Sequence, residues 1–324
     1  MSRITMIITL IILLLTAACQ PTIVPSVTPT LPPPTPAALG TPRPTYTPRV
    51  IAQPSATGTP ADMTPWLAPT DRSLPDAPVI IPTAVRLIAA APLPPDAFVF
   101  GQSTEGRDLL AWRFGAGERV LLLVGGIHTG YEANTVMLVN ELIDHFRRAP
   151  GDVLPGLSLV LVPVANPDGL ERGRVAEGRF NGGGVDLNRN WGCEGSAEAY
   201  WRTQRVDAGR QPFSEPETRA LAALVGELRP AAVVFYHSAA RGVFAGDCQP
   251  GGGVSWGLAA VLGEAAGYPY GAPFSAYRVT GTAPNWLDGQ GIPAVDVELA
   301  GTRDSEFVPN LRGVMAVQRW LAGQ

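Results

Sequence analysis

The chain has 324 residues, with 24 arginines and no lysine against 28 acidic residues, so its formal net charge is −4. That length leaves room for one large domain or two small ones. The slight negative charge argues against a broad nucleic-acid-binding surface, and the lack of lysine excludes both a Schiff-base lysine and a P-loop lysine.

The first residues, 1–19, have the pattern of a bacterial lipoprotein signal peptide. An arginine precedes an apolar run from Ile4 to about Ala18, which is shorter than the ~20 residues of a membrane span and fits a signal-peptide h-region. The run ends in TAAC, which resembles a lipobox and predicts lipidation of Cys19. Ordinary cleavage and an uncleaved N-terminal anchor are the alternatives. All three export the rest of the chain, so we expect an extracytoplasmic protein, lipid-anchored to the outer face of a bacterial membrane or otherwise secreted.

The next segment, residues 20–95, is rich in proline and threonine and has no apolar period. Such a composition buries too little surface to offset the entropy of ordering, so we expect a disordered, extended linker. Residues 71–95 are less uniform in composition and are expected to pack partly on the following domain.

Residues 96–324 have the pattern of a single three-layer α/β/α domain with a mostly parallel, mixed sheet. Near-continuous apolar runs are typical of strands covered on both faces. Four such runs occur, at 119–128, 157–169, 231–238 and 293–299.

Helical patterns separate these strands. Apolar residues recur at helical spacing in 132–148, and a last helix is expected over 309–322. The segment 214–228 opens with Ser214 and Glu217, which together predict a capping box.

Polar residues stand where these strands end, and the carboxyl ends of parallel strands share one edge of a sheet. His128, Glu132 and His237 would supply two imidazoles and a carboxylate, the three protein ligands of a catalytic zinc site. Glu298, in an apolar strand run, would take a proton from the metal-activated water. The remaining histidine, His145, is expected at the surface.

Each of these residues also has a simpler interpretation. A histidine at a strand end is often a satisfied polar residue, and Glu132 at a helix start is a partner for the helix dipole. Glu298 is placed to pair with Arg303. The joint placement at several strand ends favours a metal site.

Several further blocks follow in one order along the chain. They are GQSTEGRDL (101–109), NPDG (166–169), RFNGGGVDLNRNW (179–191), YHS (236–238), AYRVTGTAPNWL (276–287) and VELAGT (297–302). In these blocks and their order the chain resembles the zinc carboxypeptidases, or metallocarboxypeptidases, over most of the domain.

The resemblance implies a role for each matching residue. One Zn²⁺ would be bound by His128, Glu132 and His237, and Glu298 would be the general base. Four further residues would act on the substrate. Arg179 would stabilise the oxyanion, Asn188 and Arg189 would hold the terminal carboxylate, and Tyr277 would close over the bound residue.

Two features of the family site differ or stay open here. The family's first zinc pair encloses two residues, whereas His128 and Glu132 enclose three, which nearby glycines are expected to accommodate. The family's specificity pocket would include Pro284. An uncharged residue there disfavours a strict requirement for basic C-terminal side chains.

The cysteines Cys193 and Cys248 are an even pair in a chain expected to be exported, which predicts a disulfide. The alternative is two separate small buried residues.

The function expected from the resemblance is zinc-dependent hydrolysis of C-terminal peptide bonds. The substrates would be peptides with a free C-terminal carboxylate, peptidoglycan peptides among them. A related zinc deacylase or amidase of N-acyl amino acids, and a non-catalytic surface binding domain, are the alternatives. Retention of every expected residue type argues against the non-catalytic domain.

Overall fold

The computed structural model describes residues 93–195, 198–248, 253–271 and 274–324. The predicted signal peptide, Cys19 and nearly all of the predicted linker lie outside these residues. No helix within the described ranges has the length and hydropathy needed to cross a bilayer.

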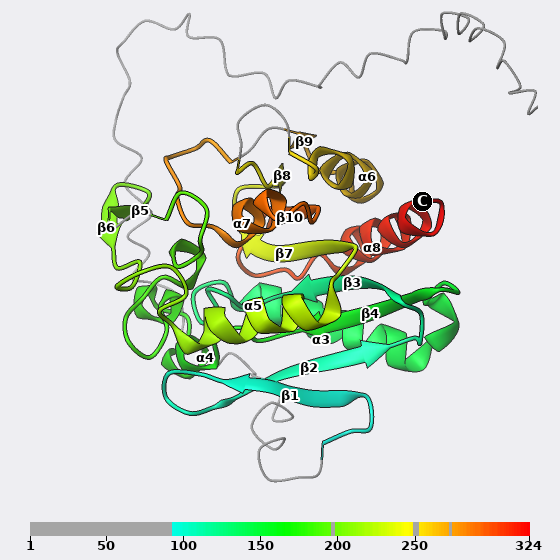
Figure 1. Cartoon of the computed structure of the whole chain (residues 1–324), viewed down its shortest axis with the longest axis horizontal. Helices are drawn as coiled ribbons and strands as arrows, with labels where there is room; N and C mark the ends of the chain where they lie inside the picture. Colours follow the sequence, from blue (N-terminus) through cyan, green and yellow to red (C-terminus); the bar gives the residue numbers. More distant parts are fainter. Residues whose placement is uncertain (1–92, 196–197, 249–252, 272–273) are drawn as a thin grey trace, which may run out of the picture. The chain divides into compact units, whose positions relative to one another are not determined.

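An eight-stranded mixed sheet forms the centre of the domain, in the order β1-β2-β4-β3-β7-β10-β8-β9 (Figure 1). The pairs β4–β3, β3–β7, β7–β10 and β8–β9 are parallel, and the other pairs are antiparallel. The strands are β1 (Ala97–Gln102), β2 (Asp108–Phe114), β3 (Arg119–Val124), β4 (Leu157–Val162), β7 (Ala232–Ser238), β8 (Gly242–Ala245), β9 (Tyr270–Gly271) and β10 (Ala294–Leu299).

Helices cover both faces of this sheet, so the predicted three-layer α/β/α fold is confirmed (Figure 1). One face packs on α3 (Ala133–Arg148), α6 (Trp256–Ala266) and α8 (Phe307–Ala322). The other packs on α5 (Pro216–Leu228) and α7 (Ala283–Gly289). Smaller elements complete the domain: α4 (Pro167–Arg172), the 3₁₀ turns Pro150–Asp152, Ala176–Arg179 and Leu187–Arg189, and a hairpin of β5 (Ala199–Trp201) and β6 (Gln204–Val206).

The strand β10 alternates strictly between the two faces. Val295, Val297 and Leu299 belong to the core beneath α3, α6 and α8. Since successive side chains of a strand point to opposite faces, Asp296 and Glu298 point together to the other face. This alternation brings two carboxylates to one side of the sheet.

The predicted capping box of α5 is wrong. The helix begins at Pro216 with Glu215 at its N-cap. The Ser214 hydroxyl donates to Glu215 Oε1 over 2.7 Å. Glu217 accepts from the Thr104 amide over 2.7 Å instead of reaching back to the helix start. A contact across 113 residues thus replaces the local one.

A disulfide joins Cys193 to Cys248, as predicted, with their Cα atoms 5.9 Å apart. It connects the segment after the 3₁₀ turn at Leu187–Arg189 with the segment after β8.

We predict that purified, exported protein contains this bridge. Loop closure over 55 residues of separation is expected to contribute about 4 kcal/mol to the free energy of unfolding in the chain-entropy model. Thiol titration of the denatured, unreduced protein should detect neither Cys193 nor Cys248. Two reactive thiols there would refute the bridge.

Candidate active site and metal centre

Three neighbouring parallel strands deliver the candidate site to one edge of the sheet. β3 and β10 flank β7 on either side. His128 follows β3, His237 is the penultimate residue of β7, and Glu298 lies opposite His237 in the register of β10. Segments far apart in sequence therefore meet without any long side chain having to bridge them.

The loop between β3 and α3 explains the long spacing of the first ligand pair. The Glu132 amide donates to the His128 carbonyl over 2.9 Å, so the intervening residues form one turn. Gly126 has a φ of +62°, which favours glycine. At Gly130, a Cβ would lie 2.3 Å from the Gly169 carbonyl oxygen. Gly130 is thus needed for close packing of backbone against backbone.

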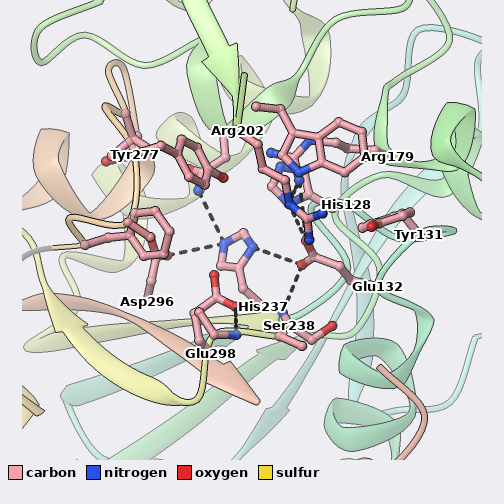
Figure 2. A pocket seen from close by; sticks show the side chains of 18 of the residues that line it. His128, Tyr131, Glu132, Arg179, Arg202, His237, Ser238, Tyr277, Asp296 and Glu298 are labelled. Carbon is pink, nitrogen blue, oxygen red and sulfur yellow. Dashed lines mark hydrogen bonds and ion pairs between the residues drawn. The ribbon is translucent and has the colours of Figure 1, made fainter. Parts of the chain in front are cut away.

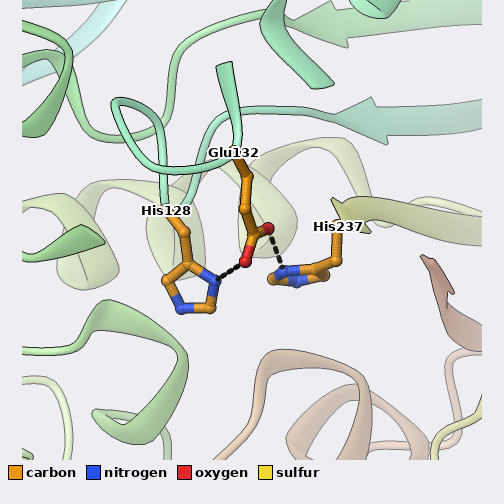
Figure 3. Close-up of side chains that lie close together, drawn as sticks. All are labelled: His128, Glu132 and His237. Atoms are coloured by element: carbon orange, nitrogen blue, oxygen red, sulfur yellow. Dashed lines mark hydrogen bonds and ion pairs between the residues drawn. The ribbon is translucent and has the colours of Figure 1, made fainter. Parts of the chain in front are cut away.

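Glu132 places its carboxylate between the two histidines (Figure 3). His128 Nδ1 lies 3.0 Å from Glu132 Oε1, and His237 Nδ1 lies 3.1 Å from Glu132 Oε2. One ligand atom from each residue falls within 4.8 Å of the others, and all three side chains are buried. His145 lies outside this cluster, paired with Asp152 over 2.7 Å.

The remaining nitrogen of each imidazole faces a carboxylate. His128 Nε2 lies 2.9 Å from Asp186 Oδ1, and His237 Nε2 lies 3.3 Å from Asp296 Oδ1. An ionised carboxylate accepts hydrogen bonds, so Asp186 favours the tautomer of His128 that has its proton on Nε2 and leaves Nδ1 for a metal. In that tautomer Nδ1 and the Glu132 carboxylate are both acceptors that face one space, next to an amino group of Arg179 that lies 3.2 Å from Nδ1 and 3.5 Å from Glu132 Oε1. The donor set therefore fits Zn²⁺, with three protein ligands and an open position.

The electrostatics of the cluster reflect this crowding. Burial alone would raise the pKa of Glu132, but His128 and His237 outweigh it and hold that pKa below its usual range. Burial would lower the pKa of His237, but Asp296 and Glu132 raise it well above its usual value. A metal-bound imidazole must be deprotonated, so zinc binding is expected to weaken in acid.

Arg179 lies beside the ligand atoms. Its Nε donates to Asp186 Oδ2 over 2.9 Å, and one of its amino nitrogens lies 3.2 Å from His128 Nδ1. The Trp201 ring of the β5–β6 hairpin lies 4.9 Å from the Arg179 guanidinium carbon. These contacts fix the guanidinium next to the metal-ligand cluster.

The residues expected to bind substrate line the same cavity, which has a volume of about 420 Å³. Arg189 donates to the carbonyls of Tyr200 and Asn188 over 3.1 and 2.7 Å, and neither partner is charged. Asn188 is held by the fold: its Oδ1 accepts from the Ala283 amide over 2.9 Å. Tyr277 stacks edge-on against another cavity residue, Phe274, with ring centroids 5.0 Å apart.

Glu298 stands on the opposite side of His237 from Arg179 (Figure 2). Its Oε2 accepts from the Ala240 amide over 3.1 Å. Burial, followed by the negative charge of Glu132, raises the pKa of Glu298 to about 7. A carboxylate with that pKa is suited to exchange protons near neutral pH.

Three residues of the site were missed in the sequence. Asp186 orients His128, Asp296 faces His237, and Trp201 stacks on Arg179. The period-2 alternation of β10, read from Glu298, was the signal available for Asp296. No sequence signal pointed to Trp201, because the β5–β6 hairpin that carries it does not appear as an apolar run in the sequence.

Comparisons with known proteins support the family resemblance. Residues 92–246 match the family model for zinc carboxypeptidases. This segment leaves out Tyr277 and Glu298 and contains the other predicted zinc, oxyanion and carboxylate-binding residues: His128, Glu132, Arg179, Asn188, Arg189 and His237.

Two curated relatives are similar in sequence. Murein peptide amidase A of Escherichia coli K12 is 31% identical over 158 residues, which is 44% of this chain and 60% of the relative. Bacteriocin BCN5 of Clostridium perfringens is 35% identical over 133 residues, 38% of this chain and 14% of the relative. The chain thus spans less than two thirds of either relative.

Among solved structures, the murein-tripeptide amidase of Escherichia coli O157 has the same fold. It superposes with a TM-score of 0.54 and 24% identity, covering 71% of this chain and 94% of the amidase.

We predict that the purified domain binds about one Zn²⁺ per chain and that His237→Ala removes most of it, because the substitution deletes one of three ligands. Metal content after dialysis is the measurement. The matched control is His145→Ala, which removes a histidine outside the cluster and should keep full zinc. Unchanged zinc affinity in Glu132→Ala would contradict the ligand set.

We further predict that Glu298→Gln changes how the stability of the metal-free protein depends on pH. The folded-state pKa of Glu298 is about 7, above the ordinary value of 4.5. The folded protein therefore binds a proton that the unfolded chain releases between these values, so stability falls as pH rises through that window. Glutamine does not titrate and removes this contribution.

The measurement compares melting temperatures of both proteins in chelator at about pH 5 and about pH 8. The wild-type protein should lose stability relative to Glu298→Gln on going to the higher pH. An equal difference at both pH values would show that Glu298 titrates normally.

Proposed function

Since residues 92–246 match the family model for zinc carboxypeptidases, we propose that this chain is a zinc metallocarboxypeptidase that hydrolyses the C-terminal peptide bond of peptides or cell-wall peptides. The observation that carries this proposal is one cavity that holds a three-residue metal site, an acid–base carboxylate and an arginine bonded to neutral carbonyls alone. The metal site is formed by His128, Glu132 and His237. The acid–base carboxylate is Glu298, and the arginine is Arg189.

The chemistry divides between the ion and the side chains. Zinc bound at the His128 side of the cavity would polarise a carbonyl and lower the pKa of water to about 7. Glu298 accepts the proton of the attacking water and returns it to the leaving amine. Its raised pKa suits both steps, since a group that titrates near the working pH both gains and loses a proton readily.

Arg179 stabilises the charge that develops on the scissile carbonyl oxygen. Its guanidinium is held by Asp186 and stacked on Trp201, so it does not have to reorganise during the reaction. A preorganised donor of this kind is typically worth about 3–4 kcal/mol in the transition state.

Arg189 binds the free carboxylate of the substrate, helped by the neighbouring Asn188. A guanidinium and a carboxylate form charge-assisted, bidentate hydrogen bonds, and Arg189 meets neutral carbonyls in the structure. Tyr277, in the loop after β9, covers the bound residue.

The substrate class is supported by the relatives. Murein peptide amidase A, by its name, acts on peptides of the bacterial cell wall. We propose that peptidoglycan peptides ending in a free carboxylate are the substrates of this chain too.

We also propose that the enzyme works outside the cytoplasm, attached to the outer face of a bacterial membrane through lipidated Cys19. The sequence pattern of residues 1–19 supports this, and a cell-wall substrate is accessible from that location. The proline- and threonine-rich segment 20–95 would let the domain reach its substrate.

We predict that the zinc-loaded protein cleaves free-acid peptides and spares the same peptides with C-terminal amides. The amide removes the charge that Arg189 binds, and leaves a buried guanidinium without its anion. Arg189→Ala should erase the preference for acids over amides while zinc stays bound. Equal cleavage of acids and amides by the wild-type protein would replace this proposal with an endopeptidase or amidase.

We predict that mature protein begins at a lipid-modified Cys19. Mass spectrometry of membrane-extracted protein should find a diacylated N-terminal peptide, and Cys19→Ala should release the protein from the membrane fraction. Unmodified peptides that span residues 10–25 in mature protein would contradict processing at this position.

A further inference from the structure

The strand β1 is the outermost strand at one end of the sheet (Figure 1). In its register with β2, Ala97 lies opposite Trp112 and Val99 lies opposite Leu110. Directly paired side chains share one face, and Trp112 belongs to the core beneath α3, α6 and α8. Val99 is nevertheless 44% exposed. The helices of the described ranges therefore leave this end of the face open.

A groove with a volume of about 570 Å³ lies beside these side chains, between β2, α3 and α4. Its lining is mostly apolar and includes Leu110, Trp112, Pro163, Val164, Pro167 and Leu170. The groove and the catalytic cavity share no lining residue among the described ones. An apolar groove on the surface of a domain typically marks a binding surface.

The indole of Trp112 indicates what kind of group the groove accepts. The side chain is 5% exposed, and its buried Nε1 has no hydrogen-bond acceptor within the part of the chain that the structure describes. An indole nitrogen only donates, and a buried donor without an acceptor is costly. Since Trp112 lines the groove, a polypeptide occupant would supply both apolar side chains and a carbonyl oxygen for this N–H.

The chain itself leads into the groove. Leu93, which is 37% exposed, lines the groove and is the first residue that the structure describes. The segment just before it, residues 79–92, reads VIIPTAVRLIAAAP and has a single charge, Arg86. Because this segment is joined covalently to the groove through Leu93, its local concentration there is high.

The charges around the groove complement that segment. Asp108 and Glu171 line the groove and are exposed, and Glu171 has no ion-pair partner among the described residues. Arg107, a cation of the same lining, already pairs with two carboxylates. Arg86 precedes Leu93 by seven residues, a stretch that spans at most about 25 Å when extended. The cation of the segment can therefore reach the acidic rim.

We propose that residues 79–92 of this chain dock in the groove between β2, α3 and α4 and cover the open end of the sheet face. The apolar side chains of the segment pack on Leu110 and Trp112, and Arg86 pairs with Glu171 at the rim. The free part of the linker then ends near residue 78, and the catalytic cavity stays uncovered. This narrows the expectation for residues 71–95 to one segment and one site.

The test is hydrogen–deuterium exchange of the intact protein, solubilised in detergent and resolved by peptide. After correction for intrinsic rates, the amides of residues 79–92 should exchange at least about tenfold more slowly than those of residues 50–70 in the same linker. Equal exchange in the two segments would overturn the proposal.

Two variants with matched controls locate the contact. Leu87→Asp places a charge in an apolar groove and should remove most of the protection, whereas Leu31→Asp makes the same change in the proline-rich part and should keep it. Val99→Asp should remove the protection from the side of the domain. Val308→Asp, at a 62% exposed position of α8, should keep it. Zinc content checks that both valine variants remain folded.

A charge exchange tests the pairing at the rim. Arg86→Glu and Glu171→Arg should each speed the exchange of residues 79–92 about two- to fivefold, the range for loss of an exposed ion pair. The double variant restores opposite charges and should restore the protection. A double variant that exchanges as fast as the single variants would overturn the assigned pair.

Other occupants give different results. Protection of residues 79–92 that falls when the protein is diluted would show that a second copy supplies the contact. Protection that persists in both Leu87→Asp and Val99→Asp would place the segment elsewhere, and faster peptide cleavage by Leu87→Asp would place it over the catalytic cavity. Each of these results overturns the proposal. The exchange measurement itself requires no turnover, so failure of the proposed enzymatic function would leave the docking intact.

Discussion

The placement of one carboxylate, that of Glu132, between two imidazoles is the constraint on which the rest of the site depends. Buried acceptor groups that face one another are unfavourable without a cation, and all three of these side chains are buried at the wall of the cavity. Asp186 fixes the imidazole of His128 so that its lone pair points inward. The loop with Gly130 is packed tightly enough to hold that arrangement before an ion arrives.

The lining of the cavity carries side chains of both charges. Arg179 and Arg189 supply positive charge, and Glu298 and Asp296 supply negative charge. A peptide end has a carboxylate and a carbonyl that becomes negative during attack, and both would meet arginines. The proton transfers of the reaction would involve Glu298. The arginines would therefore position the substrate and stabilise the oxyanion, and the carboxylate would transfer the protons.

The central strands, the first ligand pair and Glu298 were predictable because local patterns encode them. Buried parallel strands appear as apolar runs, and the polar residues that follow such runs must meet at one sheet edge. The start of α5 was not predictable, since Glu217 bonds to a residue 113 positions away.

The measurement that tests this account most directly is the turnover of Glu298→Gln with its zinc content determined in the same sample. Glutamine keeps the shape of Glu298 and its position opposite His237 but accepts no proton. The account predicts a full complement of zinc and a kcat lower by about 10²–10⁴-fold, the usual contribution of general acid–base catalysis. A zinc-loaded Glu298→Gln protein with near wild-type turnover would contradict it.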